Sequence, residues 1–283
     1  QKSNELHTTN NTRSLCLIAS CDGCMKLWDL QNKEPCAVWR ASSFFNDDST
    51  PLYFTAADTN SNTEYASMQP NYMSKSNYQT HIVSGRGSSE ICVWDLASQK
   101  LVCEYLNHGP IKEYNKEVSA MTIHPKDPNV VVIGYSNGLI TSLDTRAPSN
   151  NSVAPSNVTL NITLSGEKII CFSTNRNGDD FLYAATSAGN AVVYSASNNM
   201  ISTAYLSRKN GMTSFSGHQM LPLLSYSNKL DCPVIVSSYN KVLSRLNNFS
   251  PGSLVLFHPI FPVITVASPA SEIVTYDIGI SFH

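Results

Sequence analysis

Two stretches near the start of the chain share the pattern that decides the fold: Asp22-Gly23-Cys24-Met25-Lys26-Leu27-Trp28-Asp29-Leu30 and Gly87-Ser88-Ser89-Glu90-Ile91-Cys92-Val93-Trp94-Asp95-Leu96. In each, a Gly-containing turn leads into an alternating segment that ends in Trp-Asp. An apolar run of small residues precedes each turn, at 15–20 and at 81–84. Alternation bounded by turn residues is typical of β-strands. The two stretches therefore predict two copies of one antiparallel unit.

The same order of strand, turn, strand, turn and alternating strand recurs in six segments of the chain. The alternating strand of the third segment ends at Leu143-Asp144, and that of the sixth ends at Tyr276-Asp277. No stretch longer than about ten residues has helical periodicity. Because one such unit cannot bury both of its faces alone, the units must pack in an array. The sequence predicts an all-β fold, a WD-repeat β-propeller with six visible blades; a seven-bladed ring lacking its first blade is the alternative.

The fifth segment is the least regular of the six. It opens at 211–215, and both 223–226 and 234–238 fit its second strand. Two polar segments are expected to be loops: an insertion at 58–80 within the second blade, and a linker at 147–157 between the third and fourth blades. We expect residues 1–283 to form a single domain. Because the chain begins with Gln and has no signal-peptide pattern, we expect it to be the C-terminal portion of a larger protein.

Composition argues against several classes of function. Lys and Arg number 19 against 21 Asp and Glu, for a net charge of −2, so the basic footprint of a nucleic-acid-binding protein is missing. No apolar run reaches the roughly 18–20 residues of a membrane-spanning helix. Cys16, Cys21, Cys24 and Cys36 have a spacing found in some iron–sulfur proteins, but alternate strand residues point to opposite faces. We therefore expect reduced thiols, a cytoplasmic location, and no metal or cofactor.

Residues of the repeated motif are expected to be structural. The indoles of Trp28 and Trp94 are expected to fill space between adjacent blades, and Asp29 and Asp95 to cap local backbone donors. The remaining blade-motif residues are Asp22, Asp144 and Asp277. His124-Pro125 and His258-Pro259 each open a turn after an apolar strand, and His218 is a candidate for the same place in the fifth blade.

No arrangement of residues predicts catalysis. The carboxylate pairs Asp47-Asp48 and Asp179-Asp180 lie in polar turns, where neighbouring side chains point apart. A propeller hydrolase would need carboxylates or histidines on several innermost strands, and 118–123, 168–173 and 254–257 carry none within them. We expect no enzyme activity and no small-molecule substrate. Arg86, in a turn between the second and third strands of its blade, is the one candidate for partner binding.

The order of the blade sequences resembles the C-terminal WD-repeat propeller of the raptor family, the scaffold subunits of target-of-rapamycin complex 1. The resemblance covers nearly the whole chain, although each motif alone is common to WD repeats. Five places carry it: Leu17–Trp28 with 37–42, 84–87 with 91–95, 135–138 with 144–146, 211–215 with His218, and 257–262 with 273–277. The chain departs from the family in showing six blades rather than seven. The segments 58–80 and 233–238 also have no clear counterpart in the family.

This resemblance implies a non-catalytic scaffold within a large, nutrient-responsive kinase complex that controls growth. It implies a cytoplasmic location, with any membrane association through partners. The protease-like domain and helical repeats of the family are absent from the sequence, so no binding residues are transferred. Adaptors of vesicle coats, ubiquitin ligases or chromatin complexes are the alternative.

Overall fold

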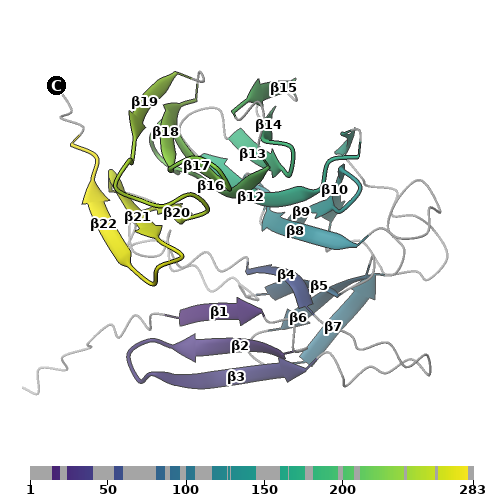
Figure 1. Cartoon of the computed structure of the whole chain (residues 1–283). Helices are drawn as coiled ribbons and strands as arrows, with labels where there is room; N and C mark the ends of the chain where they lie inside the picture. The colour runs from purple at the N-terminus through teal and green to yellow at the C-terminus, as the bar shows by residue number, and fades with distance from the viewer. Residues whose placement is uncertain are drawn as a thin grey trace, which may run out of the picture. The chain divides into compact units, whose positions relative to one another are not determined.

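A computed structural model describes the chain in separate segments. They are residues 15–19, 24–40, 54–59, 81–86, 90–95, 100–105, 117–125, 127, 129–144, 160–164, 166–175, 181–196, 200–206, 211–238, 241–258 and 261–279. These residues form 22 β-strands in six antiparallel sheets and contain no helix (Figure 1). Within these segments, therefore, no helix of the length and apolar character needed to span a membrane is present.

The chain divides into two compact units, 1–54 and 55–283, and each is described by itself. Sheet 1 belongs to the first unit and has the order β1 (Leu15–Ala19), β2 (Cys24–Asp29), β3 (Glu34–Arg40). Leu27 of β2 and Ala37 of β3 are paired across the two strands, and both are buried. The Trp-Asp segment thus forms the central strand of sheet 1.

The second unit contains five sheets, each a meander of strands that follow one another in the sequence. Sheet 2 is β4 (Phe54–Thr59), β5 (His81–Arg86), β6 (Glu90–Asp95) and β7 (Lys100–Tyr105). Sheet 3 is β8 (Val118–Ile123), β9 (Val130–Tyr135), β10 (Leu139–Asp144) and β11 (Asn161–Thr163). Sheet 4 is β12 (Ile169–Asn175), β13 (Phe181–Thr186), β14 (Asn190–Ser195) and β15 (Met200–Tyr205).

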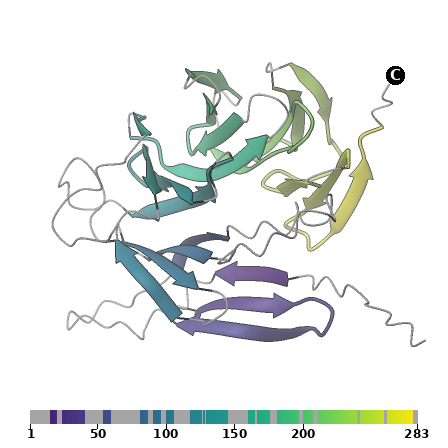
Figure 2. The same cartoon turned by 180° about the vertical axis from the view of Figure 1, so that it is seen from behind.

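The remaining two sheets complete the second unit, which is seen from behind in Figure 2. Sheet 5 is β16 (Met212–Gly217), β17 (Leu223–Asn228), β18 (Val234–Ser237) and β19 (Val242–Arg245). Sheet 6 is β20 (Leu254–Phe257), β21 (Val263–Ala267) and β22 (Ile273–Asp277). The segments 223–226 and 234–238 both fit the second strand of the fifth segment by sequence. In the structure both form strands, β17 as the second strand of sheet 5 and β18 as the third.

The all-β prediction is confirmed for the described residues, but the expected loops differ. The segment 147–157 does not link sheets 3 and 4. It lies between β10 and β11 of the same sheet, because Leu139 pairs with Thr163 and Ile140 with Ile162. β11 has only three residues, too few for alternation to be visible in the sequence. β4 extends to Thr59, so the expected insertion starts in a strand, and its residues 60–80 lie outside the described residues.

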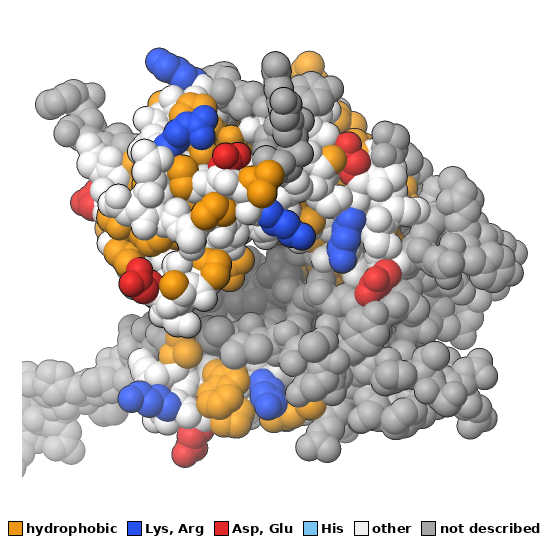
Figure 3. Space-filling view, in the orientation of Figure 1, with side chains coloured by type: hydrophobic (Ala, Val, Ile, Leu, Met, Phe, Trp, Pro, Cys, Tyr) orange, Lys and Arg blue, Asp and Glu red, His pale blue; other side chains and the backbone are white. Residues whose placement is uncertain are grey.

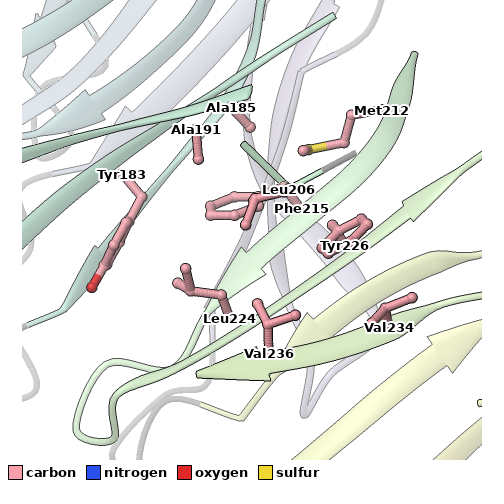
Figure 4. Close-up of a cluster of buried hydrophobic side chains, with 10 residues drawn as sticks. All are labelled: Tyr183, Ala185, Ala191, Leu206, Met212, Phe215, Leu224, Tyr226, Val234 and Val236. Atoms are coloured by element: carbon pink, nitrogen blue, oxygen red, sulfur yellow. The ribbon is translucent and has the colours of Figure 1, made fainter. Parts of the chain in front are cut away.

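The hydrophobic core of the second unit lies between consecutive sheets. Successive residues of a strand face opposite sides, so Val132 of β9 packs toward sheet 4 while Val131 and Ile133 pack toward sheet 2. The cluster between sheets 4 and 5 is drawn in Figure 4 and consists of Tyr183, Ala185, Ala191, Leu206, Met212, Phe215, Leu224, Tyr226, Val234 and Val236. Another cluster joins sheets 5 and 6, from Leu223 to Val266. Each of these sheets is thus covered by the next one along the chain.

Side chains on the first strand of one sheet also bind the backbone of the next first strand. The Ser119 hydroxyl donates to the Ile169 carbonyl at 2.7 Å. The amide of Gly217 donates to Ser173 Oγ at 2.8 Å, and the amide of Phe257 donates to Ser216 Oγ at 3.0 Å. The strands β8, β12, β16 and β20 therefore lie side by side in chain order. This succession is consistent with consecutive blades of a propeller.

Candidate interaction surface

Three turns after first strands share the sequence His-x-x-x-Pro: 124–128, 218–222 and 258–262. In each, the histidine is the first residue after the strand, and its amide donates to a carbonyl at the start of the second strand. The N···O distances are 2.8 Å from His124 to Val130, 2.9 Å from His218 to Leu223, and 2.8 Å from His258 to Val263. His218 thus occupies the same place in sheet 5 as His258 does in sheet 6.

The His218 ring is fully buried, with 0% of the residue exposed, and both of its nitrogens are hydrogen-bonded. Nδ1 accepts the amides of Met220 and Leu221, each at 3.1 Å. Since backbone amides only donate, Nδ1 carries no proton, and the proton of the neutral ring lies on Nε2. Nε2 lies 2.9 Å from the carbonyl oxygen of Phe261 and donates to it. One side chain of sheet 5 therefore closes its own turn and binds the turn of sheet 6.

Asn175 has the corresponding role between sheets 4 and 5. It is the last residue of β12 and is buried, and its Nδ2 donates to the carbonyls of His218 at 2.9 Å and Leu221 at 2.7 Å. Leu221 and Phe261 are equivalent, because each lies three residues after its histidine and immediately before proline. A side chain at the end of a first strand therefore donates a hydrogen bond to the equivalent turn carbonyl of the next sheet in two successive cases, from sheet 4 to sheet 5 and from sheet 5 to sheet 6.

Apolar side chains project to solvent from these bonded turns. Met220 is 48% exposed and Phe261 is 60% exposed. The Phe261 amide donates to Nδ1 of the exposed His258 at 3.0 Å, and the two rings lie 4.9 Å apart. We call Met220, His258 and Phe261 the turn surface. A backbone already fixed by hydrogen bonds loses little freedom when the turn is buried against another protein.

The carboxylates of Asp29 and Asp277 each bind a backbone amide in the turn that follows their own strand. Asp29 is buried, and its carboxylate accepts the amides of Gln31 at 2.9 Å and Asn32 at 3.2 Å. Asp277 lies at the end of β22, and its carboxylate accepts the amide of Gly279 at 2.9 Å.

The other residues predicted from the motif are less fully described. Trp28 is partly buried in β2, and Asp144 is partly buried at the end of β10. Trp94 and Asp95 lie in β6, but their side chains are outside the described residues, as is the whole of Asp22.

Arg86 is the last residue of β5 and is paired with Glu90 of β6. The turn after β5 is at the opposite end of its sheet from the turn after β4. Arg86 is therefore not part of the type of turn that forms the turn surface. Its side chain lies outside the described residues, and a partner-binding role for it stays a prediction.

Charged and metal-binding side chains are dispersed over the described part of the molecule. Among the described residues, no group of three or more His, Cys, Asp or Glu side chains could hold a metal ion. Figure 3 shows Lys, Arg, Asp and Glu side chains scattered among polar and apolar ones on the face it views. Glu167 is hydrogen-bonded to Thr186 at 2.6 Å and to Asn190 at 3.0 Å, which ties the start of sheet 4 to the turn after β13.

The fold is similar to that of a solved structure, Raptor from Chaetomium thermophilum. The TM-score is 0.55 at 12% sequence identity, and the alignment covers 93% of this chain and 27% of the Raptor chain. This chain thus spans about a quarter of the protein it matches. At this level of identity the likeness shows the fold alone. No protein-family model and no curated protein matches the chain.

Sequence reasoning missed the role of Asn175 and the two functions of His218. The usable signal was the His-x-x-x-Pro spacing, which 218–222 shares with 258–262. No comparable signal marks Asn175, because asparagine is common in turns of this chain. Its role follows from its place at the end of a first strand.

Proposed function

We propose that the chain is a non-catalytic WD-repeat propeller that serves as a protein-interaction scaffold, raptor-like, within a target-of-rapamycin kinase complex. One observation carries this proposal. The first strands of sheets 3 to 6 are hydrogen-bonded to one another in chain order, with the core divided between consecutive sheets. The similarity to Raptor over 93% of the chain supports the same arrangement.

The chemistry of the first strands supports a scaffold rather than an enzyme. The central channel of a propeller is lined by these strands, and a hydrolase would place carboxylates or histidines there. The strands β8, β12, β16 and β20 contain no Asp, Glu or His, whereas β4, the first strand of sheet 2, contains Asp58. Four hydroxyls on these strands bind the backbone of the next first strand: those of Ser119, Ser173, Ser214 and Ser216. The proposed place for partners is the turn surface, where Met220 and Phe261 are exposed.

Affinity purification of the endogenous full-length protein, followed by mass spectrometry, tests the proposal. We expect a very large kinase of the phosphatidylinositol-kinase-like class among the co-purified proteins. Recovery of coat, ubiquitin-ligase or chromatin subunits instead would agree with a scaffold role and would contradict membership of a kinase complex.

A matched pair of variants tests the proposed surface in the same experiment. Met220→Asp on the turn surface is expected to reduce the co-purified partners. Met200→Asp, on the outer strand β15 and 65% exposed, is the control and is expected to leave them unchanged. Equal recovery with both variants would contradict partner binding at the turn surface.

A further inference from the structure

The bonds of His218 depend on which of its nitrogens carries a proton. Nδ1 is an acceptor for two amides, and Nε2 is the donor to Phe261 of the next sheet. A proton added to Nδ1 would turn this acceptor into a donor, which would then face the two backbone N–H groups of Met220 and Leu221. A buried donor without an acceptor is costly, so the protonated ring cannot keep this position.

We propose that His218 is a proton-sensitive latch: when neutral it closes the turn of sheet 5 and binds Phe261 of sheet 6, and protonation at Nδ1 opens both contacts. The device reaches beyond the scaffold role, because it makes the turn surface responsive to pH. Met220 and Phe261 are both exposed residues, and their backbone atoms are the ones that His218 holds. Acidification is therefore expected to loosen the surface proposed for partners.

The surroundings of the ring favour its neutral form. The ring lies against Phe257, with centroids 5.6 Å apart, and the residue is fully buried. This burial lowers the pKa of His218; the hydrogen bond to Phe261 raises it, and the charge of His258 lowers it again. The folded-state pKa is thus below the value of about 6.5 expected for an unfolded chain. Stability from the latch is therefore present above about pH 6.5 and is lost as the pH falls toward the folded-state pKa.

Among the described residues, three other titratable side chains belong to the elements around His218. They are Cys171 on β12, Tyr226 on β17 and His258 after β20. Burial raises the pKa of Cys171 to about 12 and also raises the pKa of Tyr226, so neither changes charge near pH 6. His258 is exposed and lowers the pKa of His218, so a test must control for it.

Hydrogen exchange of the purified chain, corrected for the intrinsic effect of pH, measures opening of the latch. The amides of Met220 and Leu221, which donate to His218 Nδ1, are compared at pH 7.5 and 5.5. We expect their opening equilibrium to rise by up to about tenfold in the wild type, the limit set by one group with an unfolded pKa of about 6.5. His258→Asn is expected to retain this rise, whereas His218→Asn is expected to abolish it. An equal rise in His218→Asn and the wild type would overturn the proposal.

Histidine NMR of the wild type provides a second measurement that does not depend on a variant that folds. The neutral His218 ring is expected to carry its proton on Nε2 and to titrate below the value of about 6.5 expected for an unfolded chain. A proton on Nδ1 at neutral pH, or a pKa of His218 above about 6.5, would also overturn the latch.

Discussion

Single residues decide how closely the sheets approach one another, and Gly134 of β9 is the clearest case. A Cβ added at this position would lie 2.6 Å from Cγ2 and 2.8 Å from Cβ of Ile169, on the first strand of sheet 4. Ile169 is fully buried between the two sheets. The absence of a side chain at 134 therefore sets the distance between sheets 3 and 4.

Gly134→Ala is expected to lower the free energy of unfolding by about 1–3 kcal/mol, because the added methyl group overpacks the interface. Urea denaturation measures the change. In an Ile169→Ala background, which removes Cγ2, the same substitution is expected to cost less. An equal cost in both backgrounds would show that contact with Cγ2 of Ile169 is not the reason.

Cysteine reactivity tests the burial of a second residue. Burial raises the pKa of Cys171 to about 12, and its thiol donates to the carbonyl of Phe215. Since the thiolate is the reactive form, Cys171 is expected to resist alkylation of the folded chain at pH 8. The exposed Cys36 is the control and is expected to react readily. Peptide mass spectrometry measures the alkylation rate of each thiol in the folded chain and in urea. If Cys171 and Cys36 react at the same rate in both states, the burial of Cys171 is contradicted.

At the scale of elements, the alternation of small polar residues on the first strands holds one sheet against the next. Ser216 lies two residues before His218, and Leu256 lies two residues before His258, so the two positions correspond. Ser216 is 5% exposed and accepts the Phe257 amide, whereas Leu256 is 65% exposed. The corresponding position is therefore bonded in sheet 5 and exposed to solvent in sheet 6.

Ser216→Ala is expected to destabilise the chain by about 1–3 kcal/mol, because it leaves a buried amide without its acceptor. Leu256→Ala is the matched control and is expected to change stability by no more than about 0.5 kcal/mol. Chemical denaturation compares the two. A smaller effect at Ser216 than at Leu256 would contradict the assigned role of the hydroxyl.

Strands could be predicted from the sequence where apolar and polar residues alternate, or where an apolar run continues along the whole strand. β20 to β22 lie where the apolar pattern places them, and so do β8 to β10. β11 and β19 could not be predicted in this way. β11 has three residues, and all four residues of β19 are exposed, so neither has an alternating burial pattern to reveal it. Outer strands of this kind are defined by pairing with a neighbour, which the local sequence does not encode.

At the scale of the whole molecule, the contacts between sheets come from residues that are far apart in sequence. Ser119 binds Ile169, 50 residues later, and His218 binds Phe261, 43 residues later. The sequence pattern predicted the repeated unit and its order, because each unit carries its own alternation. It could not predict the bonds that Asn175 and His218 make to the next sheet, because the partner residues lie 43 to 46 positions later in the sequence. At 12% identity the similarity to Raptor shows the fold alone.

An experimental structure of the chain within its full-length protein tests the central claim most directly, which is that consecutive sheets form propeller blades linked through their first strands. We predict β8, β12, β16 and β20 side by side around one axis, with His218 Nε2 within hydrogen-bond distance of the Phe261 carbonyl. Sheets in another order, or sheets 5 and 6 separated from each other, would contradict the account.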